Sequence, residues 1–138
     1  MNRVVADASF CGAWVLQDES SDAAEALLER VESGDVSLLV PSLWKYEMLN
    51  LLRSACRRGR LDQADAAAAQ KILSQVPLEQ IDVPDAEAES AIHRLAQTHG
   101  LSAYDASYLE LVIRFQVPLY TADQALKKAA LDCGALKE

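Results

Sequence analysis

The segment Val4-Val5-Ala6-Asp7-Ala8-Ser9 decides the fold, because it sets a short apolar strand directly before an acid and a small hydroxyl. Comparable apolar segments recur at 37–40, which Pro41 closes, and at 77–83 and 118–120. One or two helical segments separate each pair of strands, and no hairpin turn joins any two of them. This alternation predicts an α/β fold in which right-handed crossovers build a parallel sheet with helices on both faces.

The segments between the strands carry apolar residues at helical spacing and recognisable helix ends. Gly34, Gly59 and Gly100 each follow a predicted helix end, where a glycine readily takes the left-handed conformation. Ser42 and Asp62 are predicted to cap the helices that follow them. The predicted helices cover 9–16, 21–33, 42–58, a segment after Asp62, 85–98, 102–115 and 124–131. Gly134-Ala135-Leu136 are predicted to begin a fifth strand.

Length and composition predict a single domain covering residues 1–138. Hydrophobic residues make up 51% of the chain and charged residues 25%, which is an ordinary balance for a globular protein. We expect no membrane span, because no apolar run approaches the roughly 18 residues that one needs. We also expect no secretory leader at the N-terminus. Cys11, Cys56 and Cys133 lack the spacing of a metal motif, so we expect reduced thiols in a cytoplasmic protein.

The net charge of −8 argues against nucleic-acid binding, because contacts with phosphates need positive surface. Bound cations would offset part of this charge locally. The basic residues also form one cluster in the sequence, made of Arg53, Arg57, Arg58 and Arg60. Two interpretations stay open for this cluster: a solvated helix end whose charge complements the helix dipole, or a contact with RNA or a protein partner.

Four acids lie at junctions between predicted strands and helices: Asp7, Glu47, Asp105 and Asp123. Asp7 and Asp123 follow the first and fourth strands, and functional groups of open α/β sheets gather beyond the carboxyl ends of the strands. Glu47 lies in the second turn of its helix and is long enough to extend back to this edge. Asp105 lies in the first turn of a helix that leads into the fourth strand, so the order of elements does not by itself bring Asp105 to the same edge.

Each acid also has a purely structural interpretation. Asp7 and Asp123 are good helix caps, Asp105 completes a capping-box pattern with Ser102, and Glu47 suits an exposed helix position. Small polar residues accompany the acids: Ser9 and Thr121 lie two residues from Asp7 and Asp123, and Asn50 lies one turn from Glu47. These side chains are predicted either to orient a carboxylate or a water or to serve as caps and turns.

The chemistry of the four acids predicts a site for a hard cation. Oxygen ligands suit Mg²⁺ or Mn²⁺, which keep several water molecules when carboxylates bind them. Such an ion activates one water as a nucleophile and offsets charge that develops on a phosphate. Hydrolysis of phosphodiester bonds is the natural chemistry of this arrangement.

Four segments, in order and at suitable intervals, resemble the motifs of a PIN domain, and in particular of VapC-like toxins from type II toxin–antitoxin pairs. They are Val4-Val5-Ala6-Asp7-Ala8-Ser9, Pro41-Ser42-Leu43-Trp44-Lys45-Tyr46-Glu47-Met48-Leu49-Asn50, Ala103-Tyr104-Asp105-Ala106-Ser107-Tyr108-Leu109 and Leu119-Tyr120-Thr121-Ala122-Asp123-Gln124-Ala125-Leu126. The resemblance implies an α/β/α sandwich around a short parallel sheet and an endoribonuclease that depends on Mg²⁺ or Mn²⁺. It assigns Asp7, Glu47, Asp105 and Asp123 as the metal-binding and catalytic acids, with Ser9 and Thr121 lining the site.

The resemblance also implies an RNA substrate, a homodimer and a small VapB-like antitoxin that covers the acidic site. Some relatives have a further acid where this chain has Ala125, which leaves the number of metal ions open. Two alternatives to a toxin stay open at this point. One is a PIN-like RNA-processing nuclease outside any toxin pair, and the other is a non-catalytic PIN-like module that binds a protein.

Overall fold

The computed structural model describes residues 2–135 and contains a parallel sheet of short strands. In sheet order these are β3 (Glu79–Ile81), β2 (Val36–Pro41), β1 (Asn2–Ala6) and β4 (Leu119–Tyr120). All three strand pairs are parallel, with Val4 beside Leu38 and Val5 beside Leu119. The predicted parallel sheet is therefore confirmed, and β1 lies between β2 and β4.

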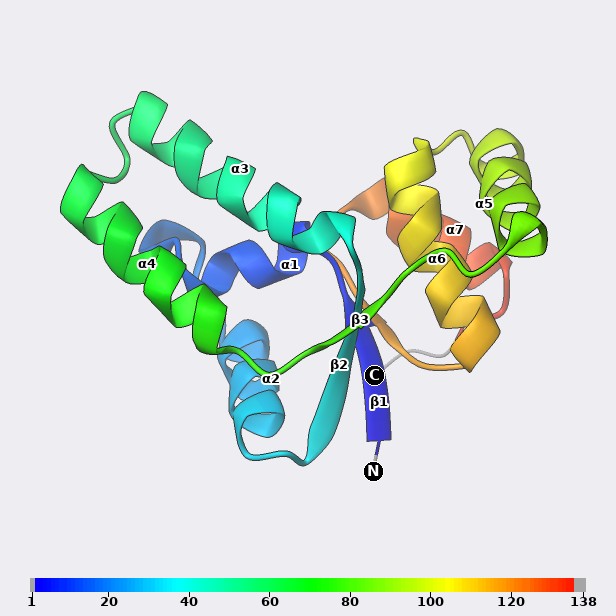
Figure 1. Cartoon of the computed structure of the whole chain (residues 1–138), viewed down its shortest axis with the longest axis horizontal. Coiled ribbons are helices and arrows are strands. Elements are labelled where there is room, and N and C mark those ends of the chain that lie inside the picture. Colours follow the sequence, from blue (N-terminus) through cyan, green and yellow to red (C-terminus); the bar gives the residue numbers. More distant parts are fainter. Residues whose placement is uncertain (1, 136–138) are drawn as a thin grey trace.

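Helices cover both faces of this sheet (Figure 1). On one side lie α1 to α4, and on the other lie α5 to α7. Their bounds are α1 (Ala8–Cys11), α2 (Asp22–Glu32), α3 (Leu43–Arg57), α4 (Gln63–Gln75), α5 (Ala86–His99), α6 (Ala103–Phe115) and α7 (Gln124–Asp132), with 3-10 turns at Gly12–Trp14 and Gln17–Glu19. The three layers confirm the predicted α/β/α sandwich.

The core lies between the sheet and the inner faces of the helices. Val5 and Leu39 are fully buried on neighbouring central strands, Trp44 and Met48 pack from α3, and Leu109 packs from α6. Burying a large apolar side chain of this kind stabilises the fold by roughly 1.5–3 kcal/mol. These buried contacts therefore hold α3 and α6, which carry Glu47 and Asp105, against the sheet.

In residues 2–135, no helix combines the length and the apolar character that a membrane span requires.

The predicted helix over 9–16 is wrong, because the α-helix ends at Cys11 and tightens into a 3-10 turn over Gly12–Trp14. Tertiary contacts explain this change. A Cβ atom at Gly12 would lie 3.1 Å from Leu51 Cδ1, a tight approach, so glycine lets the chain run close to α3 without displacing that leucine. The indole N–H of Trp14 donates a 2.8 Å hydrogen bond to the carbonyl of Ala24 and so draws the turn towards α2.

Three further details differ from the sequence prediction. Ser42 does not cap α3 with its side chain, because its own backbone is already helical (φ −58°, ψ −27°). The strand predicted over 77–83 contracts to β3, whose residues are exposed or half-buried at the edge of the sheet. The predicted fifth strand does not start within the described residues: Gly134 lies in a turn, Ala135 is in no strand, and Leu136 lies outside the described residues.

Candidate active site

Asp7 is the centre of the site and comes directly after β1. Its side chain is only 4% exposed, although it carries a carboxylate. Both carboxylate oxygens accept hydrogen bonds: Oδ1 from the Ser9 hydroxyl (2.7 Å) and the Phe10 N–H (3.1 Å), and Oδ2 from the Thr121 hydroxyl (2.6 Å). The bond from Phe10 makes Asp7 the N-cap of α1, so the predicted capping role is present together with the buried polar network.

The loop after β4 is joined to Asp7 by the same network. Thr121 Oγ1 accepts the N–H of Asp123 at 3.0 Å while its hydroxyl bonds to Asp7, and Ser9 Oγ accepts the N–H of Ala122 at 3.0 Å. The backbone N–H of Asp7 also donates to the carbonyl of Tyr120. Asp123 caps α7 by accepting the N–H of Leu126 at 3.0 Å. The structure thus brings the ends of β1 and β4 together, as the topology predicts.

Glu47 comes to the site from α3 and is held by a residue that the sequence analysis did not single out. Tyr108, which is fully buried in α6, donates its hydroxyl to Glu47 Oε1 at 2.5 Å. Tyr108 lies three residues after Asp105, and this spacing places both on neighbouring positions of one helix. This spacing could have drawn attention to Tyr108 in the sequence. It could not identify Glu47 on α3 as its partner, because that contact depends on tertiary packing.

Asp105 lies near the other acids, an approach that the order of elements left open. It lies in the first turn of α6, and its N–H donates to the hydroxyl of the N-cap Ser102 at 3.0 Å. Helix α6 packs against both β1 and β2. Its N-terminus is thereby close enough to the other acids for the charge of Asp105 to raise the pKa of both Asp7 and Glu47.

Burial and mutual repulsion disfavour ionisation of these acids. Burial is the largest cause of the raised pKa of Asp7, and hydrogen bonds from Thr121, Ser9 and Phe10 oppose it. Burial also raises the pKa of Glu47, with further contributions from Asp105 and Asp7, whereas the Tyr108 hydrogen bond lowers it. The pKa of Asp105 is raised by burial and then by the charge of Asp123.

No lysine or arginine within the described residues is among the groups that shift these three pKa values. The site is therefore a concentration of negative charge, and no cationic side chain in residues 2–135 contributes to the shifted pKa values of its acids. Its donor set consists of carboxylate and hydroxyl oxygens, which fits a hard divalent cation. In residues 2–135, however, no three acid, histidine or cysteine side chains already form a cluster that holds a metal ion. The acids are neighbours rather than a preformed cage.

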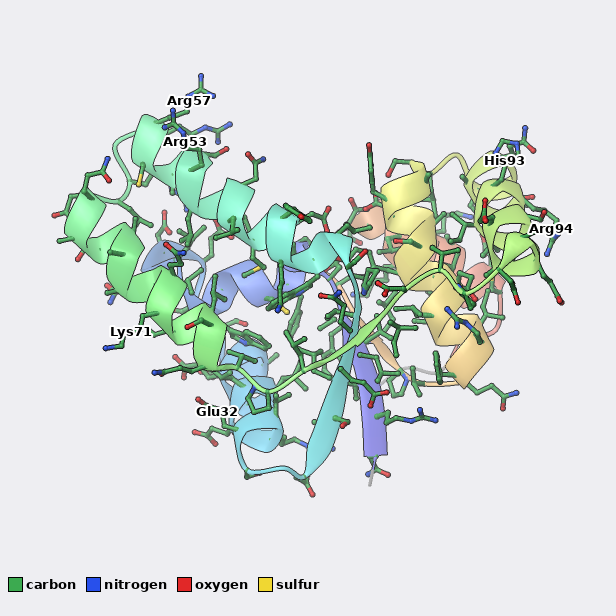
Figure 2. All side chains as sticks on the ribbon, in the orientation of Figure 1. Glu32, Arg53, Arg57, Lys71, His93 and Arg94 are labelled. Atoms are coloured by element: carbon green, nitrogen blue, oxygen red, sulfur yellow. The ribbon has the colours of Figure 1, made fainter. Side chains whose placement is uncertain are left out.

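The predicted basic cluster lies away from the acids. Figure 2 shows Arg53 and Arg57 projecting from the C-terminal end of α3, opposite the end that carries Glu47. Arg53, Arg57 and Arg58 are exposed. Asn50 is exposed as well, and within the described chain its side chain makes no hydrogen bond to any of the acids.

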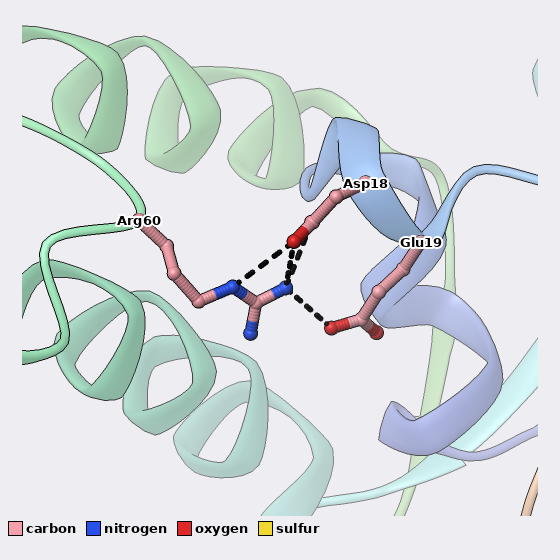
Figure 3. Close-up of polar contacts among 3 residues, drawn as sticks. All are labelled: Asp18, Glu19 and Arg60. Atoms are coloured by element: carbon pink, nitrogen blue, oxygen red, sulfur yellow. Dashed lines mark hydrogen bonds and ion pairs between the residues drawn. The ribbon is translucent and has the colours of Figure 1, made fainter.

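Arg60 differs from the rest of the basic cluster because it is held in an intramolecular contact. Its guanidinium bonds to both oxygens of Asp18 (2.7 and 2.8 Å) and to Glu19 Oε2 (2.8 Å), as Figure 3 shows. These bonds join the α3–α4 loop to the 3-10 turn at Gln17–Glu19. The structure therefore gives Arg60 a structural contact, and its predicted role towards RNA or an antitoxin stays a prediction.

Comparison with known proteins supports the same fold. The model of the PIN domain family matches residues 4–131. PAE2754 from Pyrobaculum aerophilum is 25% identical, with a TM-score of 0.72 over 99% of this chain and 89% of that one. VapC20 of Mycobacterium tuberculosis is 19% identical, with a TM-score of 0.58 over 91% of this chain and 94% of that one. VapBC2 from Rickettsia felis is 15% identical, with a TM-score of 0.64 over 91% of this chain and 92% of that one. None of the curated proteins matches the chain. The family model spans nearly the whole chain and the three-layer fold agrees with it, so this protein belongs to the PIN domain family.

Proposed function

We propose that this protein is a metal-dependent endoribonuclease and the toxin of a type II toxin–antitoxin pair. One observation carries the proposal: acids from four separate parts of the chain lie close enough that the charge of Asp105 raises the pKa of Asp7 and Glu47, and the charge of Asp123 raises that of Asp105. Burying carboxylates without a counter-charge is costly. A fold that nevertheless gathers them is expected to use their charge on a ligand.

The four acids are the proposed ligands of Mg²⁺ or Mn²⁺, through their carboxylate oxygens. When bound, the ion supplies an acidified water and offsets the charge of the phosphate. Ser9 and Thr121 hold the Asp7 carboxylate in one orientation through their hydrogen bonds. Glu47 uses Oε1 to accept the Tyr108 hydroxyl, so Oε2 is the oxygen left to bind the ion.

The proposed partners follow from the family and from the named relatives. VapC20 is described as a toxin that cleaves the sarcin–ricin loop, and VapBC2 as a complex bound to a DNA fragment from its promoter. For this chain we propose an RNA substrate, a VapB-like antitoxin and a homodimer, acting as one cytoplasmic domain. The exposed Arg53, Arg57 and Arg58 are the proposed contacts for RNA or antitoxin, because contacts with phosphates need positive surface.

The test is a cleavage assay on total RNA with purified protein. Cleavage is expected with Mg²⁺ or Mn²⁺, and it should disappear with EDTA or in Asp7→Asn. Asp22→Asn is the matched control, because Asp22 is an exposed acid at the start of α2. Cleavage that survives in Asp7→Asn would overturn the assignment. A gene for a small DNA-binding protein beside this one, whose product inhibits cleavage, would separate a toxin from an RNA-processing nuclease.

A further inference from the structure

A pocket lies at the end of the sheet opposite the acids. It has a volume of about 400 Å³, and its walls include Arg3, Arg30 and Gln116; we call it the arginine pocket. These residues come from the start of β1, the last turn of α2 and the end of α6, which meet at the end of the sheet where β1 begins (Figure 1). A strand rises about 3.3 Å per residue, so Arg3 lies about 13 Å from Asp7 along the direction of β1. The arginine pocket is therefore separate from the acidic site.

The charge of the arginine pocket differs from that of the chain as a whole. The sequence contains 21 acidic residues and has a net charge of −8, yet none of the described residues that line this pocket is acidic. Arg30 lies at the wall while its Nε donates to Asp35 Oδ2 at 3.1 Å. Arg3 is exposed and forms no ion pair within residues 2–135, and its guanidinium lies 4.9 Å from the centroid of the Phe115 ring. The pocket thus offers a guanidinium whose charge no bonded carboxylate offsets.

The donors at the arginine pocket suit a phosphate group. A guanidinium presents paired N–H donors that match two phosphate oxygens. The side-chain amides of Asn2 and Gln116 line the same pocket, and neither makes a hydrogen bond elsewhere in the described chain. A volume of about 400 Å³ falls within the roughly 300–1,000 Å³ of small-molecule sites, so the pocket has room for more than a bare phosphate.

A second pocket adjoins the first and differs from it in chemistry. Gln116 and Val117 line both pockets, and the second has a volume of about 360 Å³. Its other walls include the apolar side chains of Val112, Ile113 and Ala135. Ile113 is 43% exposed, so this wall is open to a ligand. A cationic compartment beside an apolar one matches a ligand that carries a phosphate at one end and a flat, weakly polar ring at the other.

We propose that the two pockets bind a nucleoside monophosphate, with its phosphate against Arg3 and Arg30 and its base against Ile113. Such a nucleotide is either a free mononucleotide or the 5′-terminal nucleotide of an RNA, since both carry the same phosphate and base. The site goes beyond the proposed nuclease function and does not depend on it, because none of the four acids lines either pocket.

The experiment is calorimetric titration of the full chain in EDTA, so that no metal ion at the acids takes part. Adenosine 5′-monophosphate should bind, inorganic phosphate should bind more weakly, and adenosine should not bind measurably. Arg3→Gln should weaken binding of the nucleotide about tenfold or more, as expected for a lost hydrogen bond to a charged group, and Arg3→Lys should lose less. Ile113→Ala should weaken binding of the nucleotide but not of inorganic phosphate. Arg57→Gln is the matched control, because Arg57 is an exposed arginine on α3 that lines neither pocket.

Thermal melts show whether each variant is folded, and Ile113→Ala tests the site without touching the arginines. Absence of nucleotide binding at millimolar concentration would overturn the proposal. So would an unchanged affinity in both Arg3→Gln and Ile113→Ala, or an equal loss in Arg57→Gln. Loss of binding in Asp7→Asn would place the nucleotide at the acids and would also refute the site. Competition by a short RNA with a 5′-phosphate, but not by the same RNA with a 5′-hydroxyl, would support the site and identify an RNA end as its ligand. If neither RNA competes while the mononucleotide binds, the ligand is the free nucleotide.

Discussion

The hydroxyl of Tyr108 donates a 2.5 Å hydrogen bond to Glu47 Oε1, across 61 positions of sequence, and thereby joins α6 to α3 at the acidic site. The bond favours the ionised form of Glu47, whereas burial and the charges of Asp105 and Asp7 disfavour it. Burial and the same carboxylate hold the pKa of Tyr108 far above its ordinary value, so the tyrosine remains a donor at every physiological pH. Tyr108 is therefore the residue that orients Glu47.

Removing this donor gives a direct prediction. In Tyr108→Phe, the pKa of Glu47 should rise further, so the acidic limb of the pH–rate profile should move to higher pH and kcat should fall. The free energy of unfolding should decrease by about 1.5–3 kcal/mol, as expected for a lost hydrogen bond to a charged group. Tyr104→Phe serves as the control, because Tyr104 is an exposed tyrosine. An unmoved acidic limb in Tyr108→Phe would show that Glu47 does not depend on this bond.

The raised pKa values predict how stability depends on pH without metal. The folded protein holds protons on Asp7, Glu47 and Asp105 more tightly than the unfolded chain does. In the window from the ordinary carboxyl pKa (3.8 for Asp) up to the raised folded values, the folded state binds more protons, so stability falls as pH rises through the window. Thermal melts in EDTA should therefore give a higher Tm at mildly acidic pH than at neutral pH.

Asp7→Asn should weaken that pH dependence, because it removes the most buried of the three charges. At neutral pH and without metal, its Tm should equal or exceed that of the wild type, although the variant is inactive. Asp22→Asn changes the net charge equally but should keep the wild-type pH dependence. If the Tm of the wild-type protein falls on mild acidification, burial does not dominate the energetics of these acids.

Addition of Mn²⁺ should stabilise the folded protein. A ligand that binds only the folded state adds RT ln(1 + [L]/Kd), which is about 2.7 kcal/mol at a concentration one hundred times Kd. The ion also relieves the repulsion among the acids, so the rise in Tm should be larger at neutral than at mildly acidic pH. Asp7→Asn should lose most of this rise. An unchanged Tm of the wild type at saturating Mn²⁺ would count against the proposed metal site.

Thr121 offers a test of the polar network alone. Thr121→Val keeps the shape of the side chain but removes the donor to Asp7 Oδ2 and the acceptor of the Asp123 N–H. We expect a further rise in the pKa of Asp7, weaker Mn²⁺ binding by calorimetry and reduced kcat, while Thr121→Ser retains near-normal values. Equal Mn²⁺ affinity in Thr121→Val and the wild type would mean that the hydroxyl does not orient the acid.

The basic cluster of Arg53, Arg57, Arg58 and Arg60 should separate into two groups by function. Arg57→Glu combined with Arg58→Glu should weaken RNA or antitoxin binding, and this loss should shrink at high salt because it is electrostatic. Arg60→Ala should weaken these affinities less than the double reversal does, because its guanidinium is already held by Asp18 and Glu19. It should also cause a small, salt-sensitive decrease in Tm, because surface ion pairs contribute little to stability. If the double reversal leaves both affinities unchanged, the exposed arginines are only a solvated helix end whose charge complements the helix dipole.

Much of the fold could be predicted from sequence because it depends on local patterns. The alternation of short apolar strands with helices indicated a parallel sheet, and the positions of Asp7 and Asp123 after their strands placed them at one edge. Asp62 and Ser102 cap their helices as their residue types suggest. These features are set within a few residues of one another, where propensity and hydrophobic periodicity operate.

Tertiary structure alone decided how the site is assembled. Packing of α6 on the sheet brings Asp105 among the other acids and Tyr108 against Glu47, and neither approach follows from periodicity along a single helix. The 3-10 turn after α1 likewise forms because Gly12 meets α3 and Trp14 bonds to Ala24. The sequence by itself determined which faces are buried and which strands end in acids. The meeting of particular side chains required the layers to pack, because such contacts join residues far apart in the chain.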